Sequence, residues 1–308
     1  MLNDFAVFIL THGRPENIIT LTSLKKSGYT GRLYLIIDDE DKAANSYRVK
    51  YGSDSVIMFS KKEMADKIDE GNNFDERRTI THARNACFEI ARELGVTYFI
   101  QLDDDYTSFD YRLIVNGAAV HKNIKDINKV FESLLTFYKG TQALSIAWAQ
   151  GGDFIGGLDN GKDTYRFARR KCMNTFICST EREFQFTGTF NEDVNTYTVL
   201  GSRGNLFMTI PIISITQRAT QSQAGGITEA YKKYGTYCKA FSTVMMQPSS
   251  VTVAMMRANN IRLHHRIDWP TTVPVILPEK YQKAKSLYCR ELKMHAVLPL
   301  PCAAPLKA

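Results

Sequence analysis

The hydrophobic positions in the first third of the chain predict strands that alternate with helices. Four apolar runs are typical of buried strands: FAVFIL (5–10), RLYLIIDD (32–39), SVIMFS (55–60) and VTYFIQL (96–102). The intervening residues have helical spacing, in ENIITLTSLKKSG (16–28), KKEMADKIDEG (61–71) and ITHARNACFEIARELG (80–95). This alternation predicts an α/β fold with a Rossmann-like, mostly parallel sheet that is covered on both faces.

The pattern changes after residue 140, where short apolar runs are separated by glycine-rich segments. Strands are predicted at ALSIAWA (143–149), TYRFARR (164–170), NTFICS (174–179) and FMTIPIISI (207–215). Asn160-Gly161 predicts a hairpin, residues 227–246 predict a helix, and the proline-containing tail is expected to be largely irregular. We therefore expect one continuous unit in two halves, 1–140 and 141–308, the second an antiparallel extension of the sheet.

Polar residues follow three of the four strands predicted in the first half. Ligands of open parallel sheets bind at the carboxyl ends of the strands, so these residues are expected to share one site. They are Thr11, His12 and Arg14, then Asp38 and Asp39, then Asp103, Asp104 and Asp105.

The aspartate triplet predicts a site for a divalent cation. Asp103 and Asp105 alternate in an extended chain, so both face one side while Asp104 points away. Carboxylate oxygens suit Mg²⁺ or Mn²⁺, with substrate phosphates completing the coordination. The alternative interpretation is a solvated acidic turn.

The helix predicted at 80–95 carries His82, Arg84 and Asn85 in its first turns. Helix N-termini favour anions, and Arg84 is a candidate to contact a diphosphate. A plain surface ion pair is the alternative for Arg84.

Three motifs in the second half are further candidates for chemistry. Glu192 and Asp193, in FNEDV, are candidates for a general base that deprotonates an acceptor hydroxyl. Gly225-Gly226 precedes a predicted helix, where backbone N–H groups could bind phosphate. In RLHHR, either His264 or His265 is a candidate metal ligand, with Arg262 and Arg266 as phosphate contacts. The alternatives are a surface acid pair, an ordinary loop and ordinary structural histidines.

The positive charge of the chain is unevenly distributed. Of the net charge of +7, residues 257–308 contribute +6, and RFARRK (166–171) is a second basic cluster. Such patches suit polyanions, including nucleic acid, although a solvated surface is the alternative. The nucleic-acid candidates are Arg166, Arg169, Arg170, Lys171, Arg262 and Arg266.

Composition and missing motifs narrow the class of protein. The chain is 44% hydrophobic and 23% charged, as in soluble globular proteins, and its apolar runs are too short to cross a membrane. Its six cysteines show neither CxxC nor zinc-site spacing, which suits free thiols in a reducing compartment. With no signal-peptide pattern, we expect a cytoplasmic protein without membrane contact. The sequence also lacks GxGxxG after its first strand, GxxxxGK[ST] and GxSxG.

The order of these elements resembles a known enzyme fold. ILTHGRP, LIIDDED, ITHARNACFEIA and YFIQLDDDY look like the nucleotide-sugar half of a GT-A glycosyltransferase with its DxD motif, and FNEDV resembles the acceptor-side ED element of inverting members. More narrowly, residues 71–106 together with SQAGGITEAYKKYG (222–235) are similar to the TET-associated glycosyltransferases of bacteriophages. That family is implied to place sugars on oxidised bases, such as 5-hydroxymethylcytosine, in phage DNA.

The resemblance implies a role for each candidate residue. Residues 1–140 would bind the nucleotide sugar, with Thr11, Arg14 and Asp38 or Asp39 at the nucleoside. Arg84 and Asn85 would lie near the uridine, ribose and diphosphate of a UDP-sugar. Asp103 would face the ribose or sugar, and Asp105 would bind the Mn²⁺ or Mg²⁺ ion. Residues 141–308 would bind the acceptor, with Asp193 as base and Glu192 as its alternative.

Three functions are compatible with these features. The first is a metal-dependent transferase of a hexosyl, pentosyl or N-acetylhexosaminyl group to a modified base in DNA. The second is the same core acting on a glycan or other non-DNA acceptor. The third is a non-catalytic DNA-binding protein on a transferase scaffold. The sugar, the stereochemical outcome and the oligomeric state do not follow from the sequence.

Overall fold

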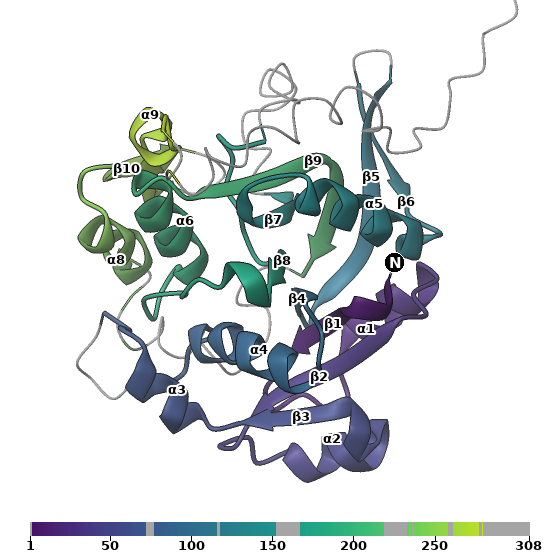
Figure 1. Ribbon diagram of the computed structural model, residues 1–308. Helices are drawn as coiled ribbons and strands as arrows, with labels where there is room; N and C mark the ends of the chain where they lie inside the picture. Colours follow the sequence, from purple (N-terminus) through teal and green to yellow (C-terminus); the bar gives the residue numbers. More distant parts are fainter. Residues whose placement is uncertain are drawn as a thin grey trace, which may run out of the picture.

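A nine-stranded sheet forms the centre of the protein (Figure 1). The computed structural model describes residues 2–71, 77–115, 118–151, 167–218, 237–257 and 261–276, with Lys233, Gly235 and Glu279. The strand order is β3-β2-β1-β4-β8-β7-β9-β5-β6, and β10 pairs with β11 in a separate hairpin. The strands are β1 (Phe5–Leu10), β2 (Arg32–Asp38), β3 (Val56–Phe59), β4 (Tyr98–Asp103), β5 (Tyr106–Val115), β6 (Ala118–Asn123), β7 (Ala143–Ala149), β8 (Phe176–Ser179), β9 (Leu206–Gln217), β10 (Val251–Arg257) and β11 (Ile261–Ile267).

The first half of the sheet is parallel, as its apolar runs predict. Strand β1 pairs in parallel with both β2 and β4, and β2 pairs in parallel with β3. All six residues of β1 are buried, because both faces of this strand are covered. The helices are α1 (Ile19–Lys26), α2 (Ala44–Tyr51), α3 (Lys61–Lys67), α4 (Thr81–Glu93), α5 (Ile127–Lys139), α6 (Glu192–Ser202), α8 (Tyr237–Met246) and α9 (Trp269–Thr272).

The second half adds antiparallel pairs to the same sheet. Strand β8 runs antiparallel to both β4 and β7, and β5 runs antiparallel to β6 and β9. Strand β9 is parallel to β7, so the extension is mixed. The fold is therefore the GT-A-like α/β arrangement that the sequence resemblance implies, with both halves in one sheet.

Two expectations for the second half are wrong in part. Residues 167–170 lie outside any strand. The helix predicted at 227–246 is interrupted at Gly235, which has a φ of +84°, so that α8 begins at Tyr237; residues 227–232 lie outside the described residues. The β10–β11 hairpin after α8 was not predicted. Asn160-Gly161 lies outside the described residues.

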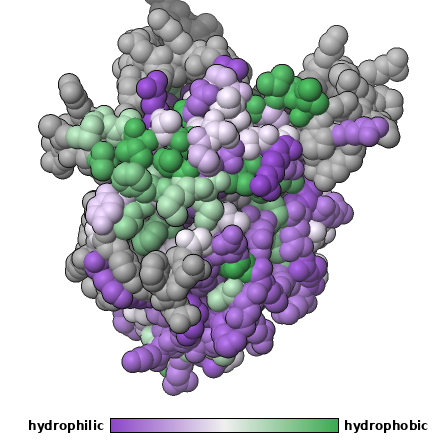
Figure 2. All heavy atoms as spheres, turned by 90° about the vertical axis from the view of Figure 1, so that its left-hand side faces the viewer, coloured by the Kyte–Doolittle hydropathy of each residue, from purple (hydrophilic) through white to green (hydrophobic). Residues whose placement is uncertain are grey.

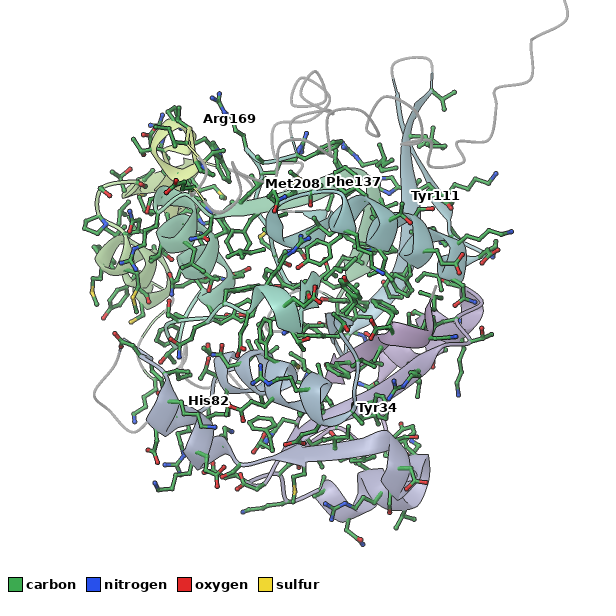
Figure 3. The ribbon with its side chains drawn as sticks, viewed as in Figure 1. Tyr34, His82, Tyr111, Phe137, Arg169 and Met208 are labelled. Atoms are coloured by element: carbon green, nitrogen blue, oxygen red, sulfur yellow. The ribbon has the colours of Figure 1, made fainter. Side chains whose placement is uncertain are left out.

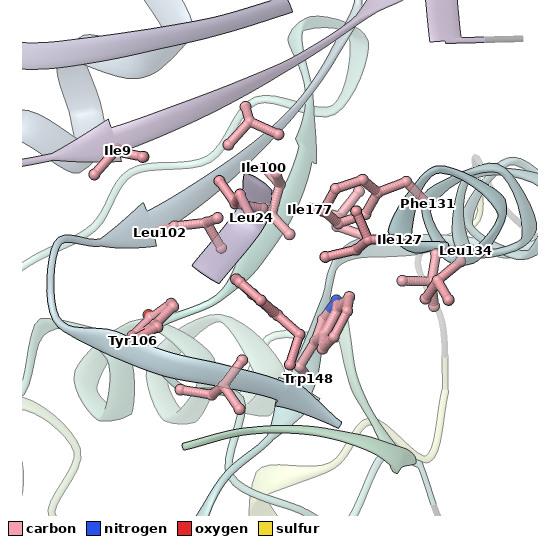
Figure 4. Close-up of a cluster of buried hydrophobic side chains, with 14 of the residues drawn as sticks. Ile9, Leu24, Ile100, Leu102, Tyr106, Ile127, Phe131, Leu134, Trp148 and Ile177 are labelled. Atoms are coloured by element: carbon pink, nitrogen blue, oxygen red, sulfur yellow. The ribbon is translucent and has the colours of Figure 1, made fainter. Parts of the chain in front are cut away.

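Two hydrophobic clusters pack on the two faces of the sheet. Alternate residues of β1 point to opposite clusters: Val7 and Ile9 to one, Ala6 and Phe8 to the other. Helix α5 and Trp148 complete the first cluster, part of which is drawn in Figure 4. Helix α4 contributes Ala86, Cys87, Phe88, Ile90 and Ala91 to the second. None of the described helices combines the length and hydrophobicity needed to cross a bilayer.

Candidate functional site

Helix α1 holds the backbone of the aspartate triplet at the end of β4. The Thr20 hydroxyl donates to the carbonyl of Asp103 (2.5 Å) and accepts from the amide of Tyr106 (2.9 Å). The Ser23 hydroxyl donates to the carbonyl of Tyr106 (2.8 Å). These bonds fix the backbone of the turn from which the three carboxylates project.

Asp104 points toward the end of β1. Its carboxylate accepts from the Thr11 hydroxyl (2.7 Å) and from the Arg14 guanidinium (3.1 Å). The Tyr47 hydroxyl lies 3.1 Å from Thr11 Oγ1 and accepts from the amide of Arg14 (2.7 Å). The middle aspartate therefore joins two strand ends, which leaves Asp103 and Asp105 for other contacts.

His12 and Asp38 form an ion pair beside this network. His12 Nδ1 lies 2.6 Å from Asp38 Oδ2, and Lys61 Nζ lies 3.5 Å from Asp38 Oδ1. The hydrogen bond to Asp38 raises the pKa of His12 above its ordinary value, although partial burial opposes this. The pKa of Asp38 is lowered, because the His12 and Lys61 contacts outweigh the opposing effect of burial. Asp39 accepts from the amide of Lys61 (2.9 Å).

Arg84 joins the two halves of the protein. Its side chain is 1% exposed; Nη2 donates to Asp103 Oδ1 (3.1 Å) and Nε donates to Glu192 Oε1 (2.9 Å). The guanidinium carbon lies 5.1 Å from the ring centroid of Phe176 and 5.8 Å from that of Phe186. Burial opposes the charge on Arg84, but Asp103 and Glu192 keep its pKa above the ordinary value. One buried cation thus connects the triplet on β4 with the start of α6.

The outer two aspartates have the chemistry of a cation site. Burial raises the pKa of Asp103 to about 7 despite Arg84, with a further contribution from Asp105. Burial and the charge of Asp104 raise the pKa of Asp105 to about 6. Within the described residues, no group of three or more His, Cys, Asp or Glu side chains is arranged to hold a metal. Two carboxylates still suit Mg²⁺ or Mn²⁺, because such ions commonly take their remaining ligands from water and substrate phosphates.

Buried contacts fix the loop that leads to α6. Asn85 donates to the carbonyl of Phe186 (3.0 Å) and accepts from its amide (2.9 Å). One residue before His82, the Thr81 hydroxyl donates to the carbonyl of Gly188 (2.7 Å). His82, labelled in Figure 3, is fully buried and its Nε2 contacts the carboxylate of Glu70. The start of α4 therefore holds Glu70 and the segment 186–188 that leads to α6.

The start of α6 requires an unusual backbone conformation. Asn191 has a φ of 53°, and Gly188 has a φ of +86° beside the Asn195 amide group. Glu192 and Asp193 occupy the first turn of the helix, and both are buried. Burial and the neighbouring Glu192 raise the pKa of Asp193 to about 6, and its Oδ1 accepts from the amide of Val194 (2.7 Å).

The two adjacent histidines differ in their surroundings. His265 is buried, and its Nδ1 lies 3.3 Å from Asn191 Nδ2. Burial, followed by the charge of Lys171, lowers the pKa of His265 to about 2. His264 Nε2 lies 3.3 Å from Lys171 Nζ, and the two imidazole rings are 4.2 Å apart. Of the two, His265 contacts the residue that precedes Glu192 and Asp193.

The remaining candidates are spread over several regions. Arg169 is exposed and extends from the top of the molecule in Figure 3, Arg170 is buried, and Arg266 is exposed. Arg166, Gly225, Gly226 and the side chain of Arg262 lie outside the described residues.

The surface near α8 is partly apolar. Phe241, Met245, Met255 and Leu263 are each at least 40% exposed. Figure 2 shows a hydrophobic area on the upper part of this face, where α8 and the β10–β11 hairpin lie, above a mainly hydrophilic lower part. On this side, the surface over α8 and the β10–β11 hairpin is therefore less polar than the surface below it.

Sequence reasoning missed five residues of this network. Three of them stabilise the strand ends: Thr20, Tyr47 and Asp41. Asp41 Oδ2 accepts from the amide of Gly13 (2.7 Å). Asn191 accompanies His265, and the carbonyl of Lys239 accepts from Asn191 Nδ2 (2.6 Å). Only Asp41 had a visible signal, since it extends the acidic run after β2.

Comparison with solved structures returns distant matches. Glucosyl-3-phosphoglycerate synthase from Mycobacterium tuberculosis, in complex with Mn²⁺, UDP and phosphoglyceric acid, is 9% identical with a TM-score of 0.46, covering 90% of each chain. The same enzyme with Mg²⁺ and UDP is 9% identical with a TM-score of 0.47, covering 90% of this chain and 91% of that one. A structure described as a mycobacterial protein is 11% identical with a TM-score of 0.43, covering 85% and 83%. No curated protein matches the chain in sequence.

A protein-family model gives the decisive match. The model described as TET-Associated Glycosyltransferase matches residues 5–226. The match begins at β1 and includes the aspartate triplet, Arg84, Glu192 and Asp193. The chain therefore belongs to the TET-associated glycosyltransferase family and is a glycosyltransferase.

Proposed function

We propose that the protein transfers a sugar from a UDP-sugar to the hydroxyl group of a 5-hydroxymethylcytosine-type base in DNA, with the help of a divalent cation. The observation that carries this proposal is the Arg84 bridge, which binds Asp103 on one side and Glu192 on the other. A transferase needs donor and acceptor in contact, and this bridge brings the strand-end carboxylates and the α6 carboxylates into one site.

On the donor side, Asp103 and Asp105 would hold Mn²⁺ or Mg²⁺. A bound cation would offset the negative charge that develops on the departing diphosphate. Arg84 keeps the Asp103 carboxylate in a fixed direction, since its guanidinium is buried beside the rings of Phe176 and Phe186. Thr11 and Arg14 restrain Asp104 in the same way, so the triplet is organised before any ligand binds.

On the acceptor side, Asp193 is the better candidate for the general base. Glu192 is engaged by Arg84, whereas the Asp193 carboxylate accepts from the adjacent backbone amide of Val194. A pKa of about 6 leaves Asp193 mostly ionised at neutral pH and close to the value at which a base works best. Its role would be to accept the proton of the attacking hydroxyl.

The family description supports a modified DNA base as acceptor, and the basic residues near α6 suit phosphates. A base inside a duplex must be extruded before an enzyme can reach it. The exposed apolar surface at α8 and the β10–β11 hairpin lies on the same half of the chain as Asp193.

A transfer screen tests the proposal. UDP-sugars are incubated with hydroxymethylated DNA, plain DNA or simple glycans, each with and without Mn²⁺, and products are identified by mass spectrometry. Metal-dependent mass gain on hydroxymethylated DNA alone is the expected result. Transfer to glycans only would show that DNA is not the acceptor. Hydrolysis of the UDP-sugar without transfer to any acceptor would support the use of this donor and count against hydroxymethylated DNA as the acceptor. DNA binding without turnover of any sugar would contradict the proposed reaction.

A further inference from the structure

A cluster of basic residues lies near the start of α6. It consists of Lys171, Lys239, His264 and His265. Lys171 Nζ is 3.3 Å from His264 Nε2, and the ring of His264 packs against that of His265 at 4.2 Å. The backbone of Lys171 is fixed, because its carbonyl accepts from the Thr209 hydroxyl on β9 (2.8 Å). The lysine is therefore positioned by the sheet rather than by solvent.

His265 has a buried nitrogen that no described residue satisfies. Its Nδ1 lies 3.3 Å from Asn191 Nδ2, so Nε2 lies on the other side of the ring. The residue is 4% exposed, and Nε2 has no hydrogen-bond partner within the described part of the chain. Buried polar atoms are nearly always paired, and an unpaired one commonly marks the place of a water or an ion.

Lys239 brings further positive charge to the same place. Its carbonyl accepts from Asn191 Nδ2 (2.6 Å), and its ammonium group acts electrostatically on both His265 and Asp193. Among the described residues, the charged groups that act on His265 are Lys171, His264 and Lys239, which are all bases. A cation is disfavoured in such surroundings, whereas an anion is favoured.

We propose that Lys171, Lys239, His264 and His265 form a phosphate-binding subsite that takes a phosphodiester group of the acceptor strand, next to the base that receives the sugar. This inference rests on the proposed function, since it names the part of the acceptor that the site binds. It also replaces the interpretation of His264 or His265 as a metal ligand.

The acceptor is the better source of that phosphate than the donor diphosphate. Asn191 contacts both His265 and Lys239 and directly precedes Glu192 and Asp193, so the cluster lies on the side of the proposed base. The donor side has its own cations, since Arg14 and Arg84 contact the aspartate triplet. A phosphate adjoining an extruded base would lie within reach of the cluster while the hydroxyl faces Asp193.

Binding of modified oligonucleotides tests the subsite without turnover. An oligonucleotide with one 5-hydroxymethylcytosine is titrated against wild type and Lys171→Ala, with fluorescence anisotropy as the readout. A neutral methylphosphonate replaces each phosphate near the modified base in turn. We expect Lys171→Ala to weaken binding about tenfold and one methylphosphonate to weaken wild type similarly. Lys171→Ala combined with that methylphosphonate should weaken binding little more than either change alone, because both remove the same contact.

Two variants serve as controls. Lys171→Arg keeps the charge and should bind within about threefold of wild type. Lys139→Ala removes a partly buried lysine, whose Nζ lies 4.3 Å from the ring centroid of Tyr98 at the other end of β4, and should bind as wild type does. Thermal denaturation of each variant verifies that the fold is intact.

A donor arm separates the two sources of phosphate. Calorimetric binding of UDP with Mn²⁺ should be unchanged in Lys171→Ala and Lys239→Ala. Weaker UDP binding with unchanged DNA binding would assign the cluster to the donor and overturn the inference. Additive losses from Lys171→Ala and every methylphosphonate would overturn it as well. If wild type transfers no sugar to any DNA, the proposed function fails, whereas the binding cycle still decides whether the cluster holds a phosphate of the strand.

Discussion

The donor and acceptor sides of the proposed site differ in their surroundings, and the pKa values of two histidines shift in opposite directions there. His12, on the donor side, lies 2.6 Å from Asp38, and that contact raises its pKa. His265, on the acceptor side, is buried near Lys171 and Lys239, and its pKa falls to about 2. The same side chain is thus favoured as a cation at one end and held neutral at the other. A site with this polarity suits a cation at one end and an anion at the other.

The two sides also differ in how the chain builds them. The donor side comes from the ends of β1, β2 and β4, which a parallel sheet brings together. The acceptor side comes from four separated segments, at Lys171, Asn191–Asp193, Lys239 and His264–His265. Arg84 contacts both sides, through Asp103 and Glu192.

Removal of Arg84 is expected to have the largest effect. Arg84→Ala leaves Asp103 and Glu192 without their buried counter-ion, and the free energy of unfolding should fall by about 3–5 kcal/mol. Urea denaturation measures the change. As a matched control, Arg92→Ala breaks a half-exposed pair with Glu183 (2.6 Å) and should cost less than about 1 kcal/mol. Equal losses in the free energy of unfolding for the two variants would show that the contacts of Arg84 with Asp103 and Glu192 contribute no more to stability than a surface ion pair.

Loss of the Asp105 carboxylate should greatly slow sugar transfer while the fold stays intact. Asp105→Asn is expected to lower the transfer rate at least roughly a hundredfold, because the cation and the diphosphate charge it offsets depend on this carboxylate. Turnover is followed by mass spectrometry and the fold by circular dichroism. Asp66→Asn alters an exposed acid on α3 and should leave the rate unchanged. A rate near that of wild type for Asp105→Asn would refute the donor-side assignment.

Burial of an acid on one side and of a base on the other predicts opposite effects of pH on stability without metal. The pKa of Asp103 is about 7 in the folded protein and near 3.8 when unfolded, so its contribution to stability declines as the pH rises from about 4 to 7. His265, with a folded pKa of about 2 and an ordinary value of 6.5, contributes stability that is present above pH 6.5 and lost as the pH falls.

Urea midpoints in EDTA between pH 4 and 8 separate the two contributions. Asp103→Asn should reduce the decline toward neutral pH, to which Asp105 and Asp193 also contribute. His265→Gln should reduce the loss toward acid pH. A single group changes the slope by at most about 1.4 kcal/mol per pH unit. Added Mn²⁺ should stabilise the protein more at pH 8 than at pH 5, because the carboxylates are ionised at pH 8. If the stability of the two variants depended on pH in the same way, Asp103 and His265 would not have opposite effects on stability.

The smallest effect is expected at His12. Asp38→Asn should move the pKa of His12 down toward its ordinary range, as read by NMR titration of the imidazole protons. His12→Gln should cost less than about 1 kcal/mol, because the histidine is half exposed. This stabilisation is complete below pH 6.5 and is lost as the pH rises through the raised pKa of the folded state. An unchanged His12 titration in Asp38→Asn would contradict the pairing.

Sequence patterns predicted the grouping of residues at the strand ends better than the grouping around the start of α6, for a physical reason. Apolar runs identify buried parallel strands, and the polar residues that follow them must meet at one edge, as Thr11, Asp38 and Asp104 do. The acceptor side depends on the left-handed backbone of Asn191 and on packing of α8 against the β10–β11 hairpin. No local pattern encodes contacts between such distant segments, so Lys239 and Asn191 were missed.

The strand order has a consequence for how the protein is made. Strand β4 is flanked on its second side by β8, and β5 pairs with β9, where Asp110 meets Ser214 roughly 100 positions later in the chain. During synthesis, the aspartate triplet therefore leaves the ribosome long before Glu192 and the strands that complete the sheet. Until then, one edge of β4 has no partner, and such edges invite pairing with other chains. The nucleotide-sugar half is thus expected to be unable to fold as a free-standing module.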